Sequence, residues 1–432
     1  MLASEDRLFT PRFFVMCGFT FTVFLSVFQI LPVAPFHIID LGGSTFASGL
    51  FLGFLTYASA FSALATGAIG DRVGHRRVLL VCSVAIAGFS IAYGLSPDYR
   101  LMLGLAVVHG VFWSGLLATS GAYMTSFLPE RRRAEGLGYW GLSSVLAIAL
   151  APNLGFWIYG HGWLWVCVSS FSLNLLMALI AYQLPDGTNT ERTRNAHGTN
   201  TETATLHSEH GMRHPEPGTR NREPGTRHPE PGTRHPFDFA QGRPAPGTLL
   251  EWRVLALSLT LFLYSFGYGA ITSFTGLYAA ANHVTPTGLY LTSLAIAILL
   301  SRPLVAPLAD RYGYRPVLIP GLALIPIGLA LLAVGGTRLW MILSATVFGL
   351  GFGTAYTVFA AYIMQRVAAA RRGAAFGAML AAFDTGIGTG STMMGWLIDA
   401  IGFGPAFGVA AAISALSLPY FLIADRRLNA SR

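Results

Sequence analysis

The 432-residue chain contains no lysine, so arginine supplies all 28 of its basic side chains other than histidine. Charged residues make up only 11% of the chain, whereas 53% of its residues are hydrophobic, and the mean hydropathy is +0.54. Soluble domains usually carry about 25% charged residues. The shortage of charge therefore excludes an ordinary soluble protein and indicates that lipid surrounds most of the chain.

Cysteine is nearly absent as well. The three cysteines, Cys17, Cys82 and Cys167, all fall within apolar runs, and no two of them stand at a spacing typical of metal ligands. We therefore expect them to be small packing residues. We expect neither a metal site nor a cofactor.

Long apolar runs recur along the chain, and we count twelve of them. Each is close to the roughly 20 residues that cross about 30 Å of hydrocarbon. Because a backbone in lipid must satisfy its own hydrogen bonds and the runs lack the alternation of a barrel, the sequence predicts an all-α polytopic membrane protein. The first run lacks a small-residue cleavage site, so we expect it to be retained. The expected spans are 13–36, 46–69, 78–95, 101–126, 136–159, 163–184, 252–281, 287–309, 317–335, 338–364, 374–399 and 403–424.

The net charge of +8 is concentrated in short loops, which argues against a nucleic-acid partner and for a lipid bilayer. The loops on the opposite side hold only Arg100 and Arg338. By the positive-inside rule, the arginine-rich loops, both termini and the central segment are predicted to be cytoplasmic, in a bacterial inner membrane. The arginines of these alternate loops are Arg72, Arg76, Arg77, Arg131, Arg132, Arg133, Arg311, Arg315, Arg366, Arg371 and Arg372.

An internal repeat organises the chain. GDRVGHRRVL at 70–79 recurs as ADRYGYRPVL at 309–318, and the same offset of 239 relates Ser26 to Ser265. The sequence therefore predicts a six-helix unit used twice in parallel. We expect an N-terminal six-helix bundle at 1–184 and a C-terminal one at 251–432. The segment 185–250 between them is rich in proline and glycine and repeats PGTRHPE, which predicts a disordered cytoplasmic linker whose histidines lack a fixed coordination geometry.

Two parallel six-helix halves with a G-x-x-x-D-R-x-G-x-R-R motif resemble the major facilitator superfamily of transporters, among them its drug/proton antiporters and sugar-efflux-like permeases. The resemblance implies two bundles around a central cavity that opens alternately to each side. The full motif has Gly67, Asp71, Arg72, Gly74, Arg76 and Arg77, and its reduced copy has Asp310, Arg311, Gly313 and Arg315.

The charged motif is predicted to act as a gate. Asp71 follows the second apolar run and can approach the positive N-terminus of a helix that starts at about Gly373 in the other half. Such a contact exists only while the cytoplasmic side is closed, so it would favour the outward-facing state. Arg76 or Arg77 can pair with Glu130 or Glu135. The alternative is a solvated loop that obeys the positive-inside rule, which explains the arginines but not the aspartate or the paired glycines.

The fifth run carries AIALAPNLG, which resembles a degenerate form of the antiporter motif G-x-x-x-G-P-x-x-G. Ala147 and Ala151 stand in place of two glycines, whereas Pro152 and Gly155 match the motif. Small residues permit close helix approach, and the proline bends the helix. Close packing alone would give the same letters, so the motif supports efflux without establishing it.

Asp384 is the one acid that we place deep in a predicted helix, roughly 18 Å from the cytoplasmic face at 1.5 Å per residue. An ionised carboxylate is expensive there, so Asp384 is our first candidate for proton coupling or cation binding. The alternative is a structural carboxyl group bonded to a neighbouring helix. Its surroundings, FDTGIGTGS, are rich in glycine, which favours a bend or close packing.

Two further polar residues lie within predicted helices. Arg302 is roughly 12 Å inside the eighth run, where it can bind an anionic substrate, pair with Asp384 or snorkel to the cytoplasmic surface. His109 is near the middle of the fourth run. Family antiporters often have R-x-x-Q-G on this helix, but Ala106 replaces the arginine here. His109 is either a titrating group or a hydrogen-bonded structural histidine.

The resemblance also implies which helices line the cavity, and an apolar, aromatic pocket with a few polar groups is expected there. Each of these side chains could equally be a packing residue. The cavity candidates are Gln29, Trp113, Asn153, Tyr264, Tyr268 and Tyr356.

Together these features predict a monomeric secondary transporter that exports a small organic compound in exchange for protons. An importer or facilitator of the same fold is the first alternative, since nothing in the sequence fixes the direction. A non-transporting receptor is an alternative of another class. An enzyme is not expected, because no constellation of paired carboxylates, metal ligands or an activated nucleophile is visible.

Overall fold

A computed structural model describes residues 8–129, 132–185, 237–238, 243–244, 252–367 and 372–430. The chain divides into two units. One unit comprises the helices before Pro185 and after Leu250, and the other is Asp186–Leu249. The predicted linker thus lies mostly outside the described residues.

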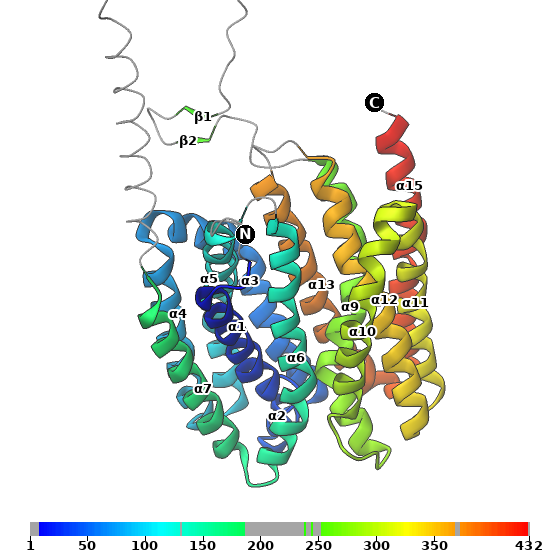
Figure 1. Ribbon diagram of the computed structural model, residues 1–432. Coiled ribbons are helices and arrows are strands. Elements are labelled where there is room, and N and C mark those ends of the chain that lie inside the picture. Colours follow the sequence, from blue (N-terminus) through cyan, green and yellow to red (C-terminus); the bar gives the residue numbers. More distant parts are fainter. Residues whose placement is uncertain are drawn as a thin grey trace, which may run out of the picture. The chain divides into compact units, whose positions relative to one another are not determined.

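The first unit is built from long helices (Figure 1). Their apolar composition and the low charge of their interiors are what a lipid environment demands. The helices are α1 (Pro11–Ile30), α2 (Ala34–Asp40), α3 (Thr45–Val73), α4 (His75–Gly94), α5 (Tyr99–Phe127), α6 (Arg133–Tyr159), α7 (Trp163–Gln183), α9 (Trp252–Ala281), α10 (Leu289–Tyr312), α11 (Tyr314–Val334), α12 (Arg338–Met364), α13 (Arg372–Ile401), α14 (Phe403–Ala415) and α15 (Ser417–Ala430).

Eleven helical spans in the described part of the chain are long and apolar enough to cross a membrane. The twelfth expected span, 374–399, forms helix α13 but is not among the eleven. Its hydropathy is lowered by Asp384, Asp399 and a run of glycine, serine and threonine between them. The fold is all-α and polytopic, as the sequence predicts.

Two expected spans are interrupted. The first is divided at Leu31–Val33 into α1 and α2, and the last is divided at Leu416 into α14 and α15. Prolines stand at both breaks, Pro32 in the first and Pro419 just after the second. Because proline lacks a backbone N–H, each removes a hydrogen bond that a continuous helix needs.

The two copies of the charged motif have the same backbone geometry. Gly74 joins α3 to α4 with φ 99°, and Gly313 joins α10 to α11 with φ 85°. Each glycine ends one helix and begins the next, in a left-handed conformation that other residues rarely adopt. The repeat offset of 239 therefore relates two equivalent helix corners.

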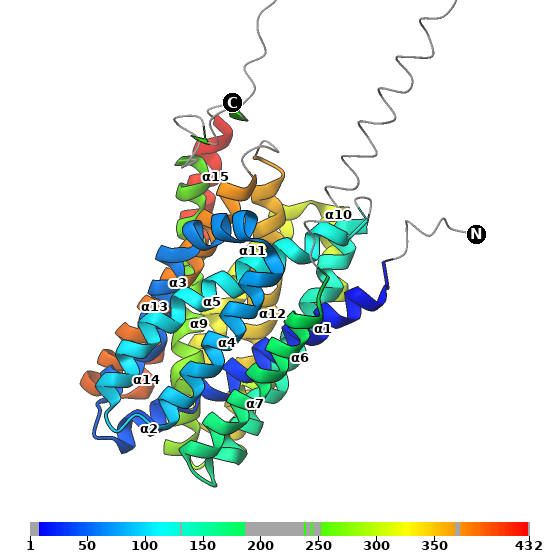
Figure 2. The ribbon, with the colours of Figure 1, turned by 90° about the vertical axis from the view of Figure 1, so that its left-hand side faces the viewer.

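Helices of each half pack mostly with one another. In the first half α1 packs on α6 and α7, and α3 and α4 pack on α5; in the second α12 packs on α10 and α11, and α9 on α13. The main contacts between the halves are α3 with α13 and α6 with α10 (Figures 1 and 2). Near-parallel pairs with small residues at their contacts allow this close approach.

The bundle has two ends, which we name by their residues. The arginine end carries Arg72 and Arg311, in the last turns of α3 and α10. The Asp399 end carries the start of α3 at Thr45 and the last turns of α13 around Asp399.

The second unit contributes one described element within the predicted linker. Strands β1 (Phe237–Asp238) and β2 (Arg243–Pro244) pair antiparallel, and Asp238 stands opposite Arg243. The sequence reading predicts no element there, so this short ladder is a departure from it.

Candidate functional site

Glycines bring α3 and α13 into close contact. A Cβ atom at Gly49 or Gly53 would collide with Ser391 or Thr392 of α13, and one at Gly388 would lie 2.7 Å from the Thr56 hydroxyl. Larger side chains would force the two halves apart at this level. The close packing expected around FDTGIGTGS is thus observed, and it joins the two halves.

Asp384 lies at the inner limit of this contact. Its side chain is 6% exposed, and its Oδ2 atom accepts a hydrogen bond of 2.7 Å from the hydroxyl of Ser59 on α3. The carboxylate therefore belongs to one half and its hydroxyl donor to the other. A buried carboxylate is costly unless it is hydrogen-bonded or protonated, so this bond ties its state to the approach of the halves.

Further hydrogen bonds between α3 and α13 lie on the Asp399 side of Asp384 and show how far the contact extends. Tyr57 donates to Thr389 at 3.0 Å, and Ser391 donates to the carbonyl of Gly49 at 2.8 Å. One turn beyond Tyr57, toward the arginine end, Phe61 is 87% exposed. The described polar contacts between α3 and α13 thus run from the Asp399 end to the level of Ser59.

Tyr356, on α12, lies within electrostatic range of both Asp384 and Arg302. Arg302 itself forms no ion pair with Asp384 or with any other described acid, so the pairing considered from the sequence is not present. The three side chains come from α10, α12 and α13, all in the second half.

Arg302 reaches toward the first half. A Cβ atom at Gly141 of α6 would lie 2.8 Å from its Nη1 atom, and its Nε atom is buried without a hydrogen-bond partner. Gly141 is eight residues after Arg133, at which α6 begins, which is roughly 12 Å along the helix. The guanidinium therefore does not extend to the surface at the arginine end.

The second contact between the halves uses the predicted motif of α6. Asn153 donates to the Thr292 hydroxyl at 2.9 Å, and Thr292 donates to the Ala149 carbonyl at 2.6 Å. Pro152 lies inside α6, three residues after Ala149. Because proline has no backbone N–H, one hydrogen bond of the helix is missing there. Ala147 and Ala151 are fully buried, and Gly155 packs directly on the backbone of Gln29 in α1. The motif serves packing both within and between halves.

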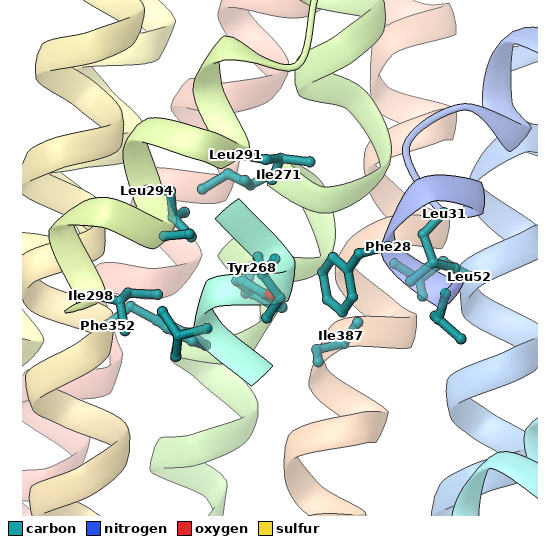
Figure 3. Packing of buried hydrophobic residues seen from close by; sticks show 14 of the residues in the cluster. Phe28, Leu31, Leu52, Tyr268, Ile271, Leu291, Leu294, Ile298, Phe352 and Ile387 are labelled. Atoms are coloured by element: carbon teal, nitrogen blue, oxygen red, sulfur yellow. The ribbon is translucent and has the colours of Figure 1, made fainter. Parts of the chain in front are cut away.

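Aromatic side chains of the second half form a cluster. Tyr268 stacks on Phe352 with ring centroids 4.5 Å apart, and Tyr356 and Phe383 are 5.1 Å apart. Tyr264 is fully buried, and its hydroxyl has no hydrogen-bond partner. Figure 3 shows Tyr268 and Phe352 among the buried hydrophobic residues that surround this group. The tyrosines proposed from sequence thus lie together.

The candidates of the first half lie apart from this group. His109 is 5% exposed, its Nδ1 atom is 3.1 Å from the Tyr93 hydroxyl, and its ring stacks on Phe89. It borders a cavity of about 10 Å³, which has room for about one water molecule. Gln29 accepts from Ser169 of α7 at 3.1 Å. These two side chains bond to helices of their own half.

Trp113 also packs within the first half, where its ring meets Phe24 edge to face at 5.7 Å. Like His109, it lies on α5. We therefore do not retain Gln29, Trp113 or His109 as first candidates for a central site.

Of the two acids expected to pair with Arg76 or Arg77, Glu135 binds another arginine, and pairing with Glu130 stays a prediction. Arg76 donates to the Tyr182 carbonyl at 2.5 Å, whereas Glu135 binds Arg132 at 2.9 Å instead of Arg76 or Arg77. Glu130 lies outside the described part of the chain. Of Gly67, Asp71 and Asp310 only the backbone is described, so the predicted gate contact of the Asp71 side chain stays a prediction. Arg72, Arg77 and Arg311 are exposed.

The reduced motif binds an acid that the sequence reading missed. Arg315 Nε lies 3.4 Å from Asp425 Oδ2 on α15, and Arg366 Nη2 lies 3.9 Å from Oδ1 of the same carboxylate. Tyr362 also donates to Asp425.

Comparison with known proteins decides the family. The model of the Major Facilitator Superfamily matches residues 16–281 and 257–432. The chain belongs to this superfamily. An uncharacterized MFS-type transporter of Methanocaldococcus jannaschii is 20% identical over 405 residues, which cover 93% of this chain and 95% of that one.

Other relatives match one part of this superfamily member. The multidrug export protein EmrB of Escherichia coli K12 is 27% identical over 140 residues, 32% of this chain and 27% of EmrB. The D-galactonate transporter of Escherichia coli O6:H1 is 29% identical over 164 residues, 36% of each chain. The crystal structure of the nucleoside transporter NupG has the same fold, with a TM-score of 0.67, 14% identity, and coverage of 96% of this chain and 99% of NupG. The protein is thus a multi-pass membrane transporter of this superfamily.

Proposed function

We propose that this protein is a proton-coupled transporter that exports a small organic compound by alternating access. The observation that carries the proposal is the hydrogen bond between Ser59 and Asp384, because it places a buried carboxylate on the contact between the halves. Gain or loss of a proton at Asp384 changes the free energy of that contact. A proton can therefore shift the population of the two transport states.

The arginine end is proposed to face the cytoplasm, as the positive-inside rule requires. The starts of α1 and α9 and the end of α15 then lie on the cytoplasmic side together with the linker. With the halves joined at the Asp399 end and Phe61 exposed toward the arginine end, this arrangement corresponds to an inward-facing state.

Export is supported by the relationship to EmrB and by the small residues around Pro152 on α6.

Proton-coupled uptake is the second candidate, and Arg302 favours it. An anion bound at Arg302 would be repelled by an ionised Asp384, so it would bind best when Asp384 carries its proton. Solute and proton would then move in the same direction.

Proteoliposomes with an imposed pH difference test both the coupling and its direction. Radiolabelled 3-phenylpropionate serves as the probe, because aromatic rings line the second half. Protein-free liposomes correct for passive movement of the weak acid. Exchange against protons accumulates the probe in the acidic compartment, whereas cotransport accumulates it in the alkaline one.

Asp384→Asn is expected to abolish the response to the pH difference, since the amide cannot exchange the proton. Thr385→Val is the matched control, because the neighbouring Thr385 donates to the Ala381 carbonyl of its own helix. Full coupling in Asp384→Asn contradicts the proposal, as does a wild-type flux that ignores the gradient. Binding without any flux would favour the receptor alternative.

A further inference from the structure

Arg302 has no counterpart in the first half. The residue 239 positions earlier is Ala63, so the first copy of the six-helix unit has only a methyl group at the equivalent position. A guanidinium inside a membrane-spanning helix is costly. Because the fold does not need it, another role must account for the charge.

The positive charge of Arg302 is not neutralised by the protein. Among the residues that the structure describes, no carboxylate lies within ion-pair distance of it. Its Nε–H is buried and donates to nothing. Arg302 is partly buried, and an arginine taken out of water without a paired acid leaves its charge uncompensated.

The position of Arg302 between the halves suits a ligand. Gly141 of α6 provides the space for the guanidinium, since a methyl group there would lie 2.8 Å from Nη1. The site is therefore formed by one residue from each half, and movement of the halves would change it. Alternating access requires such a location for a substrate.

One tyrosine lies within electrostatic range of Arg302, and a second lies within electrostatic range of the first. Tyr356 interacts electrostatically with Arg302 and with Tyr264, and the buried Tyr264 hydroxyl is free of any partner. A guanidinium binds a carboxylate strongly, and a phenolic hydroxyl that comes within reach of the bound anion can donate to it as well. The aromatic rings of Phe352 and Phe383 beside the tyrosines offer an apolar surface for the rest of a ligand.

We propose that Arg302, with Tyr356 and Tyr264, binds the carboxylate of an organic anion whose apolar body rests on the aromatic side chains of the second half. The proposal rests on the proposed transport function and names its substrate class. Gly141 leaves room beside the guanidinium.

Equilibrium binding to the purified full-length protein tests the proposal. The probes are 3-phenylpropionate, 3-phenylpropanamide and 3-phenylpropylamine, which share one apolar body and differ in the charge of the head group. We expect the carboxylate to bind at least about ten-fold more tightly than the amide, and the amine to bind most weakly. Equal affinity for carboxylate and amide, or no binding of the carboxylate, overturns the proposal.

Arg302→Gln is expected to lower the affinity for the carboxylate at least about ten-fold, to that of the amide, while the amide affinity is unchanged. Arg302→Lys should restore part of the preference. Arg338→Gln, an exposed arginine at the start of α12, is the matched control and should change nothing. A preference that survives in Arg302→Gln overturns the proposal.

If Arg302→Gln does not fold, Gly141→Leu gives the same information, because its larger side chain would occupy the place of the guanidinium, whereas a methyl group would meet only the flexible end of Arg302. Its preference for the carboxylate should fall several-fold, and an unchanged preference counts against the proposal. Binding in detergent needs no pH gradient. Carboxylate binding without proton coupling would therefore refute the proposed coupling and leave the anion site intact.

Discussion

The carboxylate of Asp399, near the end of α13, accepts a hydrogen bond of 3.0 Å from the backbone N–H of Phe46, in the first turn of α3. The bond joins the two halves at the Asp399 end, where a negative charge meets the positive N-terminus of a helix. The sequence predicts the converse contact at the arginine end, between Asp71 of α3 and the start of α13. Helices α3 and α13 would then each carry one acid that joins the halves, Asp71 when the arginine end is closed and Asp399 when the Asp399 end is closed.

Removal of the Asp399 carboxylate should open the end that it closes. A typical intramolecular hydrogen bond contributes about 0.5–1.5 kcal/mol net, and a bond to a charged group contributes about 1.5–3 kcal/mol, which exposure to water reduces toward the lower range. Because this bond is exposed, we expect Asp399→Ala to raise the population open at this end about two- to twelve-fold. Distances between spin labels at Pro97 and Arg338, in a chain with its cysteines replaced, report the populations.

The control for this measurement is Asp40→Ala. Asp40 lies at the same end and accepts a hydrogen bond from Tyr159, but both residues belong to the first half. It should leave the label distances unchanged. An Asp399→Ala protein with the wild-type distance distribution would remove Asp399 from the gate.

Gly49→Val should prevent the same end from closing. The added side chain would meet the backbone of Ser391, which cannot move as a flexible side chain can. We expect a folded protein whose transport falls at least about ten-fold, with the label distance lengthened, since overpacking of this kind costs about 1–3 kcal/mol. Gly104→Val, with no atom within 4 Å of the added Cβ, is the control. Normal transport by Gly49→Val would show that close approach here is dispensable.

The sequence predicts the helices well because lipid imposes long apolar runs, and their breaks at prolines follow from the missing N–H. Asp384 can be singled out from the sequence for the same reason, since an acid in an apolar helix is conspicuous. Ser59 was not, because serine is ordinary in such helices and its partner lies in the other half, 325 residues away.

The sequence does not distinguish which side chains face a central cavity. A helix that is apolar on every side gives no periodic signal of its central face, so the sequence groups Gln29 and Trp113 with the tyrosines, whereas the contacts described for them are with the first half. Asp425 was missed because it stands near the chain end, where an acid looks solvated. Burial against Arg315 became visible only in three dimensions.

Asp425 should stabilise the second half. Its carboxylate accepts from Tyr362 and lies near two arginines, and it is almost fully buried. Asp425→Asn should lower the free energy of unfolding by about 1.5–3 kcal/mol, because charge-assisted bonds are lost. Thermal unfolding in detergent measures the change. Arg427→Gln, exposed on the same helix, should leave the unfolding temperature unchanged, and an equal shift in both variants would assign the effect to general charge.

The two copies of the charged motif should contribute unequally to transport. Asp71 belongs to the full copy and is predicted to approach the start of α13, whereas Asp310 belongs to the reduced copy. Both follow the same backbone path into a left-handed glycine, Gly74 or Gly313, so substitution disturbs the local fold equally. Asp71→Ala should therefore slow the transport cycle more than Asp310→Ala does, because only the first loses a contact between halves. Initial rates of probe transport in matched proteoliposomes decide this, and equal rates would mean that Asp71 is not a gate.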